Sequence, residues 1–160
     1  MMTIKKSILI PASKENVWSV LVDDPYNREW YAVFGKTAPK TNWGQGHKVV
    51  FTDKSRNGIT GKVAAKTPYE MLSIVYDGVL VNGIEDHESE LAATVKGAEE
   101  TYALQEVAGQ TLLTVVRDVH EEKYDSMEQA WDTALQRISE LAHSQKKSDN
   151  SEKMILKVEN

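Results

Sequence analysis

The segment "IPASKENVWSVLVDD", Ile10 to Asp24, passes from a strand directly into a helix and decides how the fold begins. The preceding run, Thr3 to Ile10, has the apolar alternation of a strand. Pro11 lacks the amide hydrogen that the next ladder position needs, so the strand ends there. Ser13 is a favourable helix N-cap, and the apolar residues after it have helical spacing. The segment therefore predicts a helix over residues 14–22, with its tryptophan packed in the core.

A second short helix is predicted immediately afterwards. Asp24 can act as its cap, and Pro25 suits the first helical position because its missing amide hydrogen is not needed there. Tyr26, Trp30 and Tyr31 then share one face.

The middle of the chain has the pattern of hairpin-linked strands. Short connections containing Asn-Gly, Pro or Gly favour antiparallel neighbours. A further strand at 35–42 would be confined to a sheet edge by Pro39. The predicted strands cover residues 3–10, 47–52, 59–66, 70–76, 100–107 and 111–119.

The last strong pattern is an amphipathic helix beginning near Tyr124, where Asp125 and Glu128 resemble a capping box. About twenty residues of helix span roughly 30 Å, enough to cross a small sheet. We expect residues 1–143 to form one domain and residues 144–160 to be a flexible polar tail. The apolar end of that tail, 154–158, could instead form an edge strand or dock on a neighbouring chain.

Composition limits the function classes. A 160-residue chain with 41% hydrophobic residues fits one domain, and the absence of cysteine excludes disulfides and thiolate metal sites. The net charge of -5, with both signs scattered along the chain, argues against nucleic-acid binding. No segment has the length and hydropathy of a membrane span or signal sequence, so we expect a soluble cytoplasmic protein.

The sequence contains no phosphate-binding glycine loop, zinc-protease motif or nucleophile elbow, so neither a cofactor nor a metal is expected. The run Glu85-Asp86-His87-Glu88 invites a metal or acid–base interpretation. Consecutive side chains point in different directions, however, and acidic loops are usually solvated, which favours a surface role.

The order of elements predicts an α+β fold in which a curved antiparallel sheet of about six or seven strands wraps on the long C-terminal helix. This order resembles the START-related helix-grip superfamily (SRPBCC), which includes the birch-pollen allergen and polyketide cyclase-like proteins. Within it, the chain is most similar to the branch named after the heat-shock protein 90 ATPase activator homologues. The residues that carry this resemblance are Ile10, Ala12, Val17, Trp18, Leu21, Asp24, Pro25, Trp30, Trp43, Gly46, Pro68, Leu72, Gly109, Thr111, Leu113, Thr114, Val115, Trp131 and Leu135.

The resemblance implies a cavity between sheet and helix, with the two short helices helping to close one end. A small hydrophobic or amphipathic ligand is the leading functional hypothesis, and the pocket would be mostly apolar. If side chains fill this space, the same residues are core instead. The candidate lining residues are Phe51, Val63, Ile74, Tyr76, Tyr102, Leu104, Val115, Trp131, Ala134, Leu135 and Ile138.

Two polar residues are further candidates for ligand contact. By strand alternation, His47 and Arg117 share faces with apolar residues and would point toward the cavity. A buried charge there would need a partner or an anionic ligand. The alternative is that each lies at a water-exposed rim of the sheet.

Two other function classes remain open. One is a protein-interaction module like the co-chaperone after which the branch is named, as a monomer or a homodimer. The other is a cyclase-like or hydrolase-like enzyme that pairs His47 with Tyr76 or Arg117.

Residues 78–99 form a long connection. Asp86 is expected to cap a short helix bearing Leu91 and Val95, with Gly97 ending it. We expect either a lid over the cavity mouth or a plain surface excursion or extended sheet edge.

Overall fold

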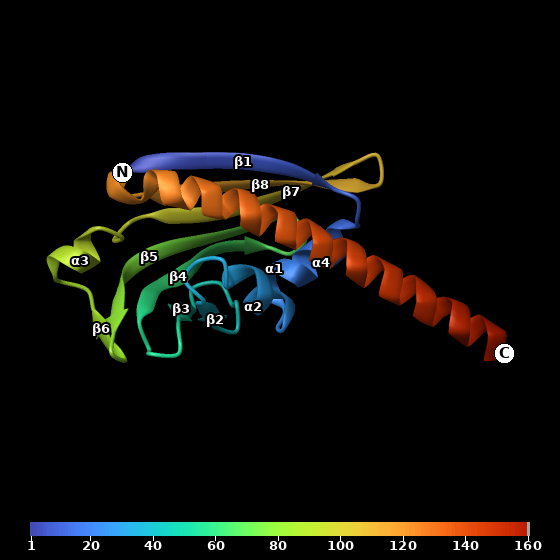
Figure 1. The fold of residues 1–160 in the computed structure, drawn as a ribbon, viewed down its shortest axis with the longest axis horizontal. Coiled ribbons are helices and arrows are strands. Elements are labelled where there is room, and N and C mark those ends of the chain that lie inside the picture. The colour runs from blue at the N-terminus through green and yellow to red at the C-terminus, as the bar shows by residue number, and fades with distance from the viewer. Residues whose placement is uncertain (160) are drawn as a thin grey trace.

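In the computed structural model, which describes the backbone of residues 1–159 and the side chains of residues 1–145, one curled antiparallel sheet wraps around a long helix (Figure 1). The predicted α+β helix-grip architecture is confirmed. Its elements are β1 (Met2–Ile10), α1 (Lys14–Val22), α2 (Tyr26–Tyr31), β2 (Ala38–Lys40), β3 (Lys48–Thr52), β4 (Gly58–Thr67), β5 (Met71–Val81), β6 (Ile84–Asp86), α3 (Glu90–Ala93), β7 (Glu99–Val107), β8 (Gln110–Val119), the 3-10 helix η1 (Glu121–Lys123) and α4 (Tyr124–Glu159).

The sheet follows the order β1-β8-β7-β5-β4-β3-β2, and every pair is antiparallel. The short strand β6 lies off this path and pairs with the end of β5. β1 pairs with β8 along its whole length, from Met2 opposite Val119 to Ile10 opposite Thr111. The first and last strands are therefore neighbours, and the helix that follows β8 returns across the concave face.

The transition from β1 into two helices is as predicted. The Ser13 hydroxyl caps α1 by accepting from the amide of Asn16 at 3.2 Å. Trp18 is buried, and the indole N–H of Trp30 donates to the carbonyl of Val20 at 2.8 Å, which ties α2 to α1. The start of α2 differs, because Asp24 does not cap it but pairs with Arg28.

The start of α4 also differs from the prediction. The backbone is already helical in η1, where the His120 ring accepts a hydrogen bond from the amide of Glu122. Asp125 therefore lies inside the continuous helical segment and does not form the predicted capping box with Glu128. At its other end α4 continues to Glu159, and residues 154–158 are helical rather than a strand. The side chains of the predicted tail lie outside the described residues from Lys146 onward, and its flexibility stays a prediction.

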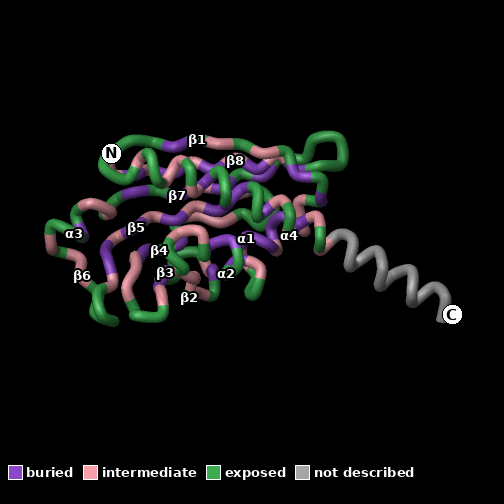
Figure 2. Tube along the Cα trace, in the orientation of Figure 1, coloured by how far each residue is buried: buried purple, intermediate pink, exposed green. Residues whose placement is uncertain are grey.

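The hydrophobic core lies between the concave face of the sheet and the helices. Buried residues alternate along β5 and β8 and recur on one face of α4 (Figure 2). All the predicted apolar and aromatic lining residues belong to this core, namely Phe51, Val63, Ile74, Tyr76, Tyr102, Leu104, Val115, Trp131, Ala134, Leu135 and Ile138. Within residues 1–159, no helix combines the length and hydropathy needed to cross a bilayer.

Replacing Ile138 by Ala tests the packing of helix on sheet. Ile138 is completely buried, so the cavity left behind should lower the free energy of unfolding by about 2–5 kcal/mol. Gln136→Ala, at an exposed position of the same helix, should change it by less than about 0.5 kcal/mol. Urea denaturation measures both, and equal effects would contradict the packing described above.

Candidate functional site

A cavity of about 420 Å³ lies where the sheet meets the first turns of α4. Its apolar lining comes from the segment after α2, from β3 and β4, from the segment after α3, and from β8 and α4. Representative apolar members are Phe34, Phe51, Ile59, Val95, Val119 and Trp131. The cavity is thus an apolar space assembled from segments far apart in the sequence.

The interface between sheet and helix is filled at one end and open at the other. α1 and α2 pack beside the middle of α4, as shown by contacts of Gln145 with Ser19 and of Arg137 with Glu29. α3 and β6 lie instead on the side where α4 begins (Figure 1). The large side chains of α1 and α2, including Trp18 and Trp30, therefore fill one part and leave the other open.

The predicted lining residues divide accordingly. Phe51, Tyr76 and Trp131 belong to the core and also line the cavity, together with Arg117, whereas the other apolar candidates are core residues that do not line it. His120, at the start of η1, is partly buried and also lines the cavity.

His47 does not lie at this cavity. It precedes β3 in an exposed turn, and its Nδ1 lies 2.7 Å from Oδ1 of Asn42. Strand alternation does not apply before the strand begins, so of the two orientations predicted for His47 the one toward the cavity was wrong and the water-exposed one is observed. The constellation of His47 with Tyr76 or Arg117 is consequently not formed.

A cluster of buried polar side chains forms one side of the cavity. Its centre is Glu100 on β7, which stands directly opposite Arg117 on β8 and is only 3% exposed. Oε1 of Glu100 accepts from Tyr76 at 2.8 Å, and Oε2 accepts from Tyr31 at 2.9 Å and from Tyr102 at 2.5 Å. We call these five residues the polar cluster.

Arg117 pairs with Glu100 across the two strands. Its Nε lies 3.2 Å from Oε1, which is an ion-pair distance, but the N–H is not aimed well enough for a hydrogen bond. Nη1 donates to the backbone carbonyl of Asp118, and the guanidinium carbon lies 4.5 Å from the centre of the Tyr76 ring. The guanidinium is therefore paired with Glu100 and stacked on Tyr76, but few of its N–H donors form hydrogen bonds.

Burial and the nearby carboxylate keep the three tyrosine hydroxyls of the polar cluster protonated. Burial, together with the nearby Glu100 carboxylate, raises the pKa of Tyr31, Tyr76 and Tyr102 well above the usual value. Burial works against the charged guanidinium, but the pKa of Arg117 is nevertheless raised, and the Glu100 carboxylate is among the groups that favour its charge. The polar cluster consequently holds one negative and one positive charge, surrounded by neutral donors.

Sequence reasoning missed Glu100 and Tyr31. Glu100 alternates with Tyr102 and Leu104 on the buried face of β7, just as Arg117 alternates with apolar residues on β8. The test that singled out Arg117, a charge on an apolar strand face, would have found Glu100 as well.

The long connection after β5 forms part of the cavity wall. Its first portion is a hairpin at Asn82 and Gly83, both with positive φ (53° and 81°), a pattern that Asn-Gly signals in sequence and that was overlooked. Ser89, not Asp86, caps α3 by accepting from the amide of Ala92. Asp86 instead accepts from the amides just before the helix.

The segment then turns inward toward the cavity. Thr94, Val95 and Ala98 line the cavity, whereas Leu91 is 56% exposed. Gly97 has a positive φ of 86° after the helix. The segment is thus a wall of the cavity, and its movement as a lid stays a prediction.

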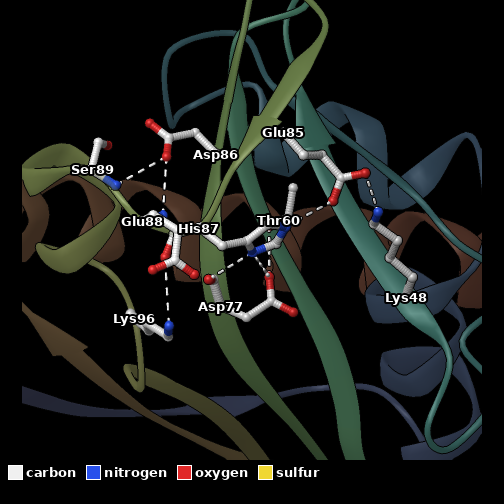
Figure 3. Close-up of polar contacts among 9 residues, drawn as sticks. All are labelled: Lys48, Thr60, Asp77, Glu85, Asp86, His87, Glu88, Ser89 and Lys96. Carbon is white, nitrogen blue, oxygen red and sulfur yellow. Dashed lines mark hydrogen bonds and ion pairs between the residues drawn. The ribbon is translucent and has the colours of Figure 1, made fainter.

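His87 connects this segment to the sheet (Figure 3). Its Nδ1 lies 2.9 Å from the carbonyl oxygen of Asp77 and its Nε2 lies 3.3 Å from Glu85, which in turn pairs with Lys48. Asp77 also accepts from Thr60 at 2.6 Å. Across the part of the chain that is described, no three acidic or histidine side chains are grouped to hold a metal ion.

The match to known families agrees with the fold. The family model "Activator of Hsp90 ATPase homolog 1-like protein" matches residues 11–143. The chain belongs to this family. The search of curated proteins gave no match.

Solved structures share the architecture at low identity. Protein MLL2253 from Mesorhizobium loti is 14% identical with a TM-score of 0.71, over 89% of this chain and 98% of that chain. The Aha1 dimer from Colwellia psychrerythraea is 19% identical with a TM-score of 0.64, over 87% and 94%. CalU16 from Micromonospora echinospora is 17% identical with a TM-score of 0.62, over 94% and 82%. These likenesses show the fold.

Replacing Glu100 by Gln should be strongly destabilising, because it leaves Arg117 as a buried charge without its partner. Breaking a buried ion pair in this way costs about 3–5 kcal/mol. Glu99→Gln, on the exposed side of the same strand, is the matched control and should cost less than about 0.5 kcal/mol. Urea denaturation of the two variants would refute the importance of the pair if they behaved alike.

The contacts of His87 predict a pH dependence. Its bond to the Asp77 carbonyl and the nearby carboxylates of Asp77 and Glu85 raise its pKa above the usual value. The protonated His87 ring stabilises the contact of residues 85–89 with β5, which we call docking. This stabilisation is fully present below the pKa of His87 in the unfolded chain, about 6.5, and is lost as pH rises through its pKa in the folded protein.

NMR titration of the backbone amides of residues 85–89 should detect this loss of docking. His87→Gln should abolish the titration, whereas His120→Gln should leave it unchanged. Persistence of the titration in His87→Gln would assign it to another group.

Proposed function

We propose that this chain binds a small apolar or amphipathic molecule in the cavity beside the first turns of α4. The observation that carries the proposal is the cavity itself, whose volume of about 420 Å³ lies in the range of small-molecule sites, roughly 300–1,000 Å³. Its lining is mostly aromatic and aliphatic, with a few buried polar groups that can fix orientation. This combination is typical of ligand pockets.

The polar cluster supports binding better than catalysis. Glu100 accepts three tyrosine hydroxyls and faces Arg117, so both of its oxygens are already engaged by protein groups. The tyrosine hydroxyls remain protonated, and their hydrogens are directed to Glu100. A proton-transfer step would need a pair of groups free to exchange a proton, and the polar cluster holds its protons in place.

A neutral fluorescent dye tests the proposal directly. N-phenyl-1-naphthylamine should become fluorescent in the cavity, and Ala130→Phe should abolish the signal because Ala130 lines the cavity. Gln136→Phe adds the same ring at an exposed position of α4 and should keep it. Equal dye binding by both variants would show that the dye lies elsewhere.

Native mass spectrometry of protein purified from its own host identifies what the cavity holds. A recurring small mass that disappears in Ala130→Phe would support the proposal. If the protein carries no ligand and fails to bind the dye, the search moves to a protein partner. The oligomeric state, monomer or homodimer, is read in the same spectra.

A further inference from the structure

The guanidinium of Arg117 is a poorly satisfied charged group at the cavity, where the indole N–H of Trp131 is also buried without a hydrogen-bond partner. The residue is only 6% exposed, and Nη1 donates to the carbonyl of Asp118. Its Nε is buried without a hydrogen bond, whereas Nη2 donates none of the hydrogen bonds among the described residues and is not fully buried. Buried polar groups are rarely left unpaired, because each lost hydrogen bond has a desolvation cost. Since Arg117 lines the cavity, the missing acceptor can come from a ligand.

We infer that the cavity takes a neutral aromatic carbonyl compound, whose oxygen accepts a hydrogen bond from Nη2 of Arg117. The inference rests on the proposed function and names the ligand class of that same site. It requires three properties of the ligand: an oxygen acceptor, no negative charge, and a flat ring system.

The acceptor should be neutral because Arg117 is already matched by Glu100. An anionic ligand at Arg117 would place a second negative charge beside Glu100 in the buried polar cluster, which is costly in a low-dielectric interior. Lys123, the other cation that lines the cavity, is exposed to solvent and outside the polar cluster. The tyrosine hydrogens cannot relieve that charge, because Tyr31, Tyr76 and Tyr102 direct them to Glu100 or to one another. A carbonyl oxygen uses the free donor without disturbing this balance.

The aromatic side chains that line the cavity favour a ligand with a flat ring system. Phe34 and Trp131 have ring centres 4.7 Å apart, and Tyr31 and Phe51 have ring centres 4.9 Å apart, all four lining the cavity. Aromatic side chains favour offset or edge contacts with other rings, beyond the gain from apolar burial. A flat aromatic ligand can make such contacts while its carbonyl faces Arg117.

Three matched probes test the inference on the unaltered protein. They are 2-acetonaphthone, which carries a neutral carbonyl, 2-ethylnaphthalene, which lacks it, and 2-naphthoate, which is anionic. Displacement of N-phenyl-1-naphthylamine gives each dissociation constant. Because hydrogen bonds to charged groups contribute most, the ketone should bind roughly tenfold or more tightly than the hydrocarbon. It should also bind more tightly than the naphthoate.

The possible outcomes separate this inference from the proposed function. Equal binding of ketone and hydrocarbon, or tightest binding of the naphthoate, overturns the inference while the cavity remains a binding site. Failure of every probe and of the dye overturns both. A ¹⁵N shift of the Arg117 guanidinium on adding the ketone, absent with the hydrocarbon, is the result expected from a direct contact.

A double variant adds an independent check. Glu100→Gln with Arg117→Met removes both charges together, so no buried charge is left unpaired. The ratio between ketone and hydrocarbon affinities should fall to near one. A ratio that stays near tenfold overturns the role of Arg117, and if the variant does not fold, the ¹⁵N spectrum of the unaltered protein decides.

Discussion

The ion pair between Glu100 and Arg117 is the constraint on which the open end of this fold depends. The two residues stand opposite each other on adjacent strands and both project into the interior. Buried charges are tolerated only when they are paired and hydrogen-bonded. Tyr31 from α2 and Tyr76 from β5 meet this requirement, so the polar cluster links the sheet to the short helices. Collapse of the sheet onto α4 at this point would further desolvate a guanidinium that has few partners.

The two ends of the interface between sheet and helix consequently differ: one is filled by core side chains and the other leaves a cavity. Where α1 and α2 pack beside α4, large apolar side chains fill the space and provide stability. Where α4 begins, the wall is formed by the segment after α3 and the polar cluster, and a cavity remains. From the sequence alone, filled core and ligand cavity were alternatives for this interface. The structure places filled core along residues 131–142 of α4 and the cavity at the beginning of the helix.

Much of the fold follows from local chemistry in the sequence. Pro11, Ser13 and the helical spacing after them determine the passage from β1 to α1, and the long amphipathic pattern determines α4. The site was harder to predict because it depends on which strand faces meet. Arg117 was recognised by its apolar neighbours, Glu100 was overlooked, and His47 was misplaced because it lies in a turn outside β3. Pairing of β6 with β5 depended on the Asn82-Gly83 turn, a local signal hidden inside a long connection.

The most direct test of the account is where a bound molecule lies. Intermolecular NOEs between N-phenyl-1-naphthylamine and protein methyl groups can locate it. The account predicts NOEs to Met127 and Val95, which line the cavity, and none to Ile138, which is buried in the filled core. NOEs confined to exposed side chains such as Ile84 and Leu91 would place the dye on the surface and contradict the account.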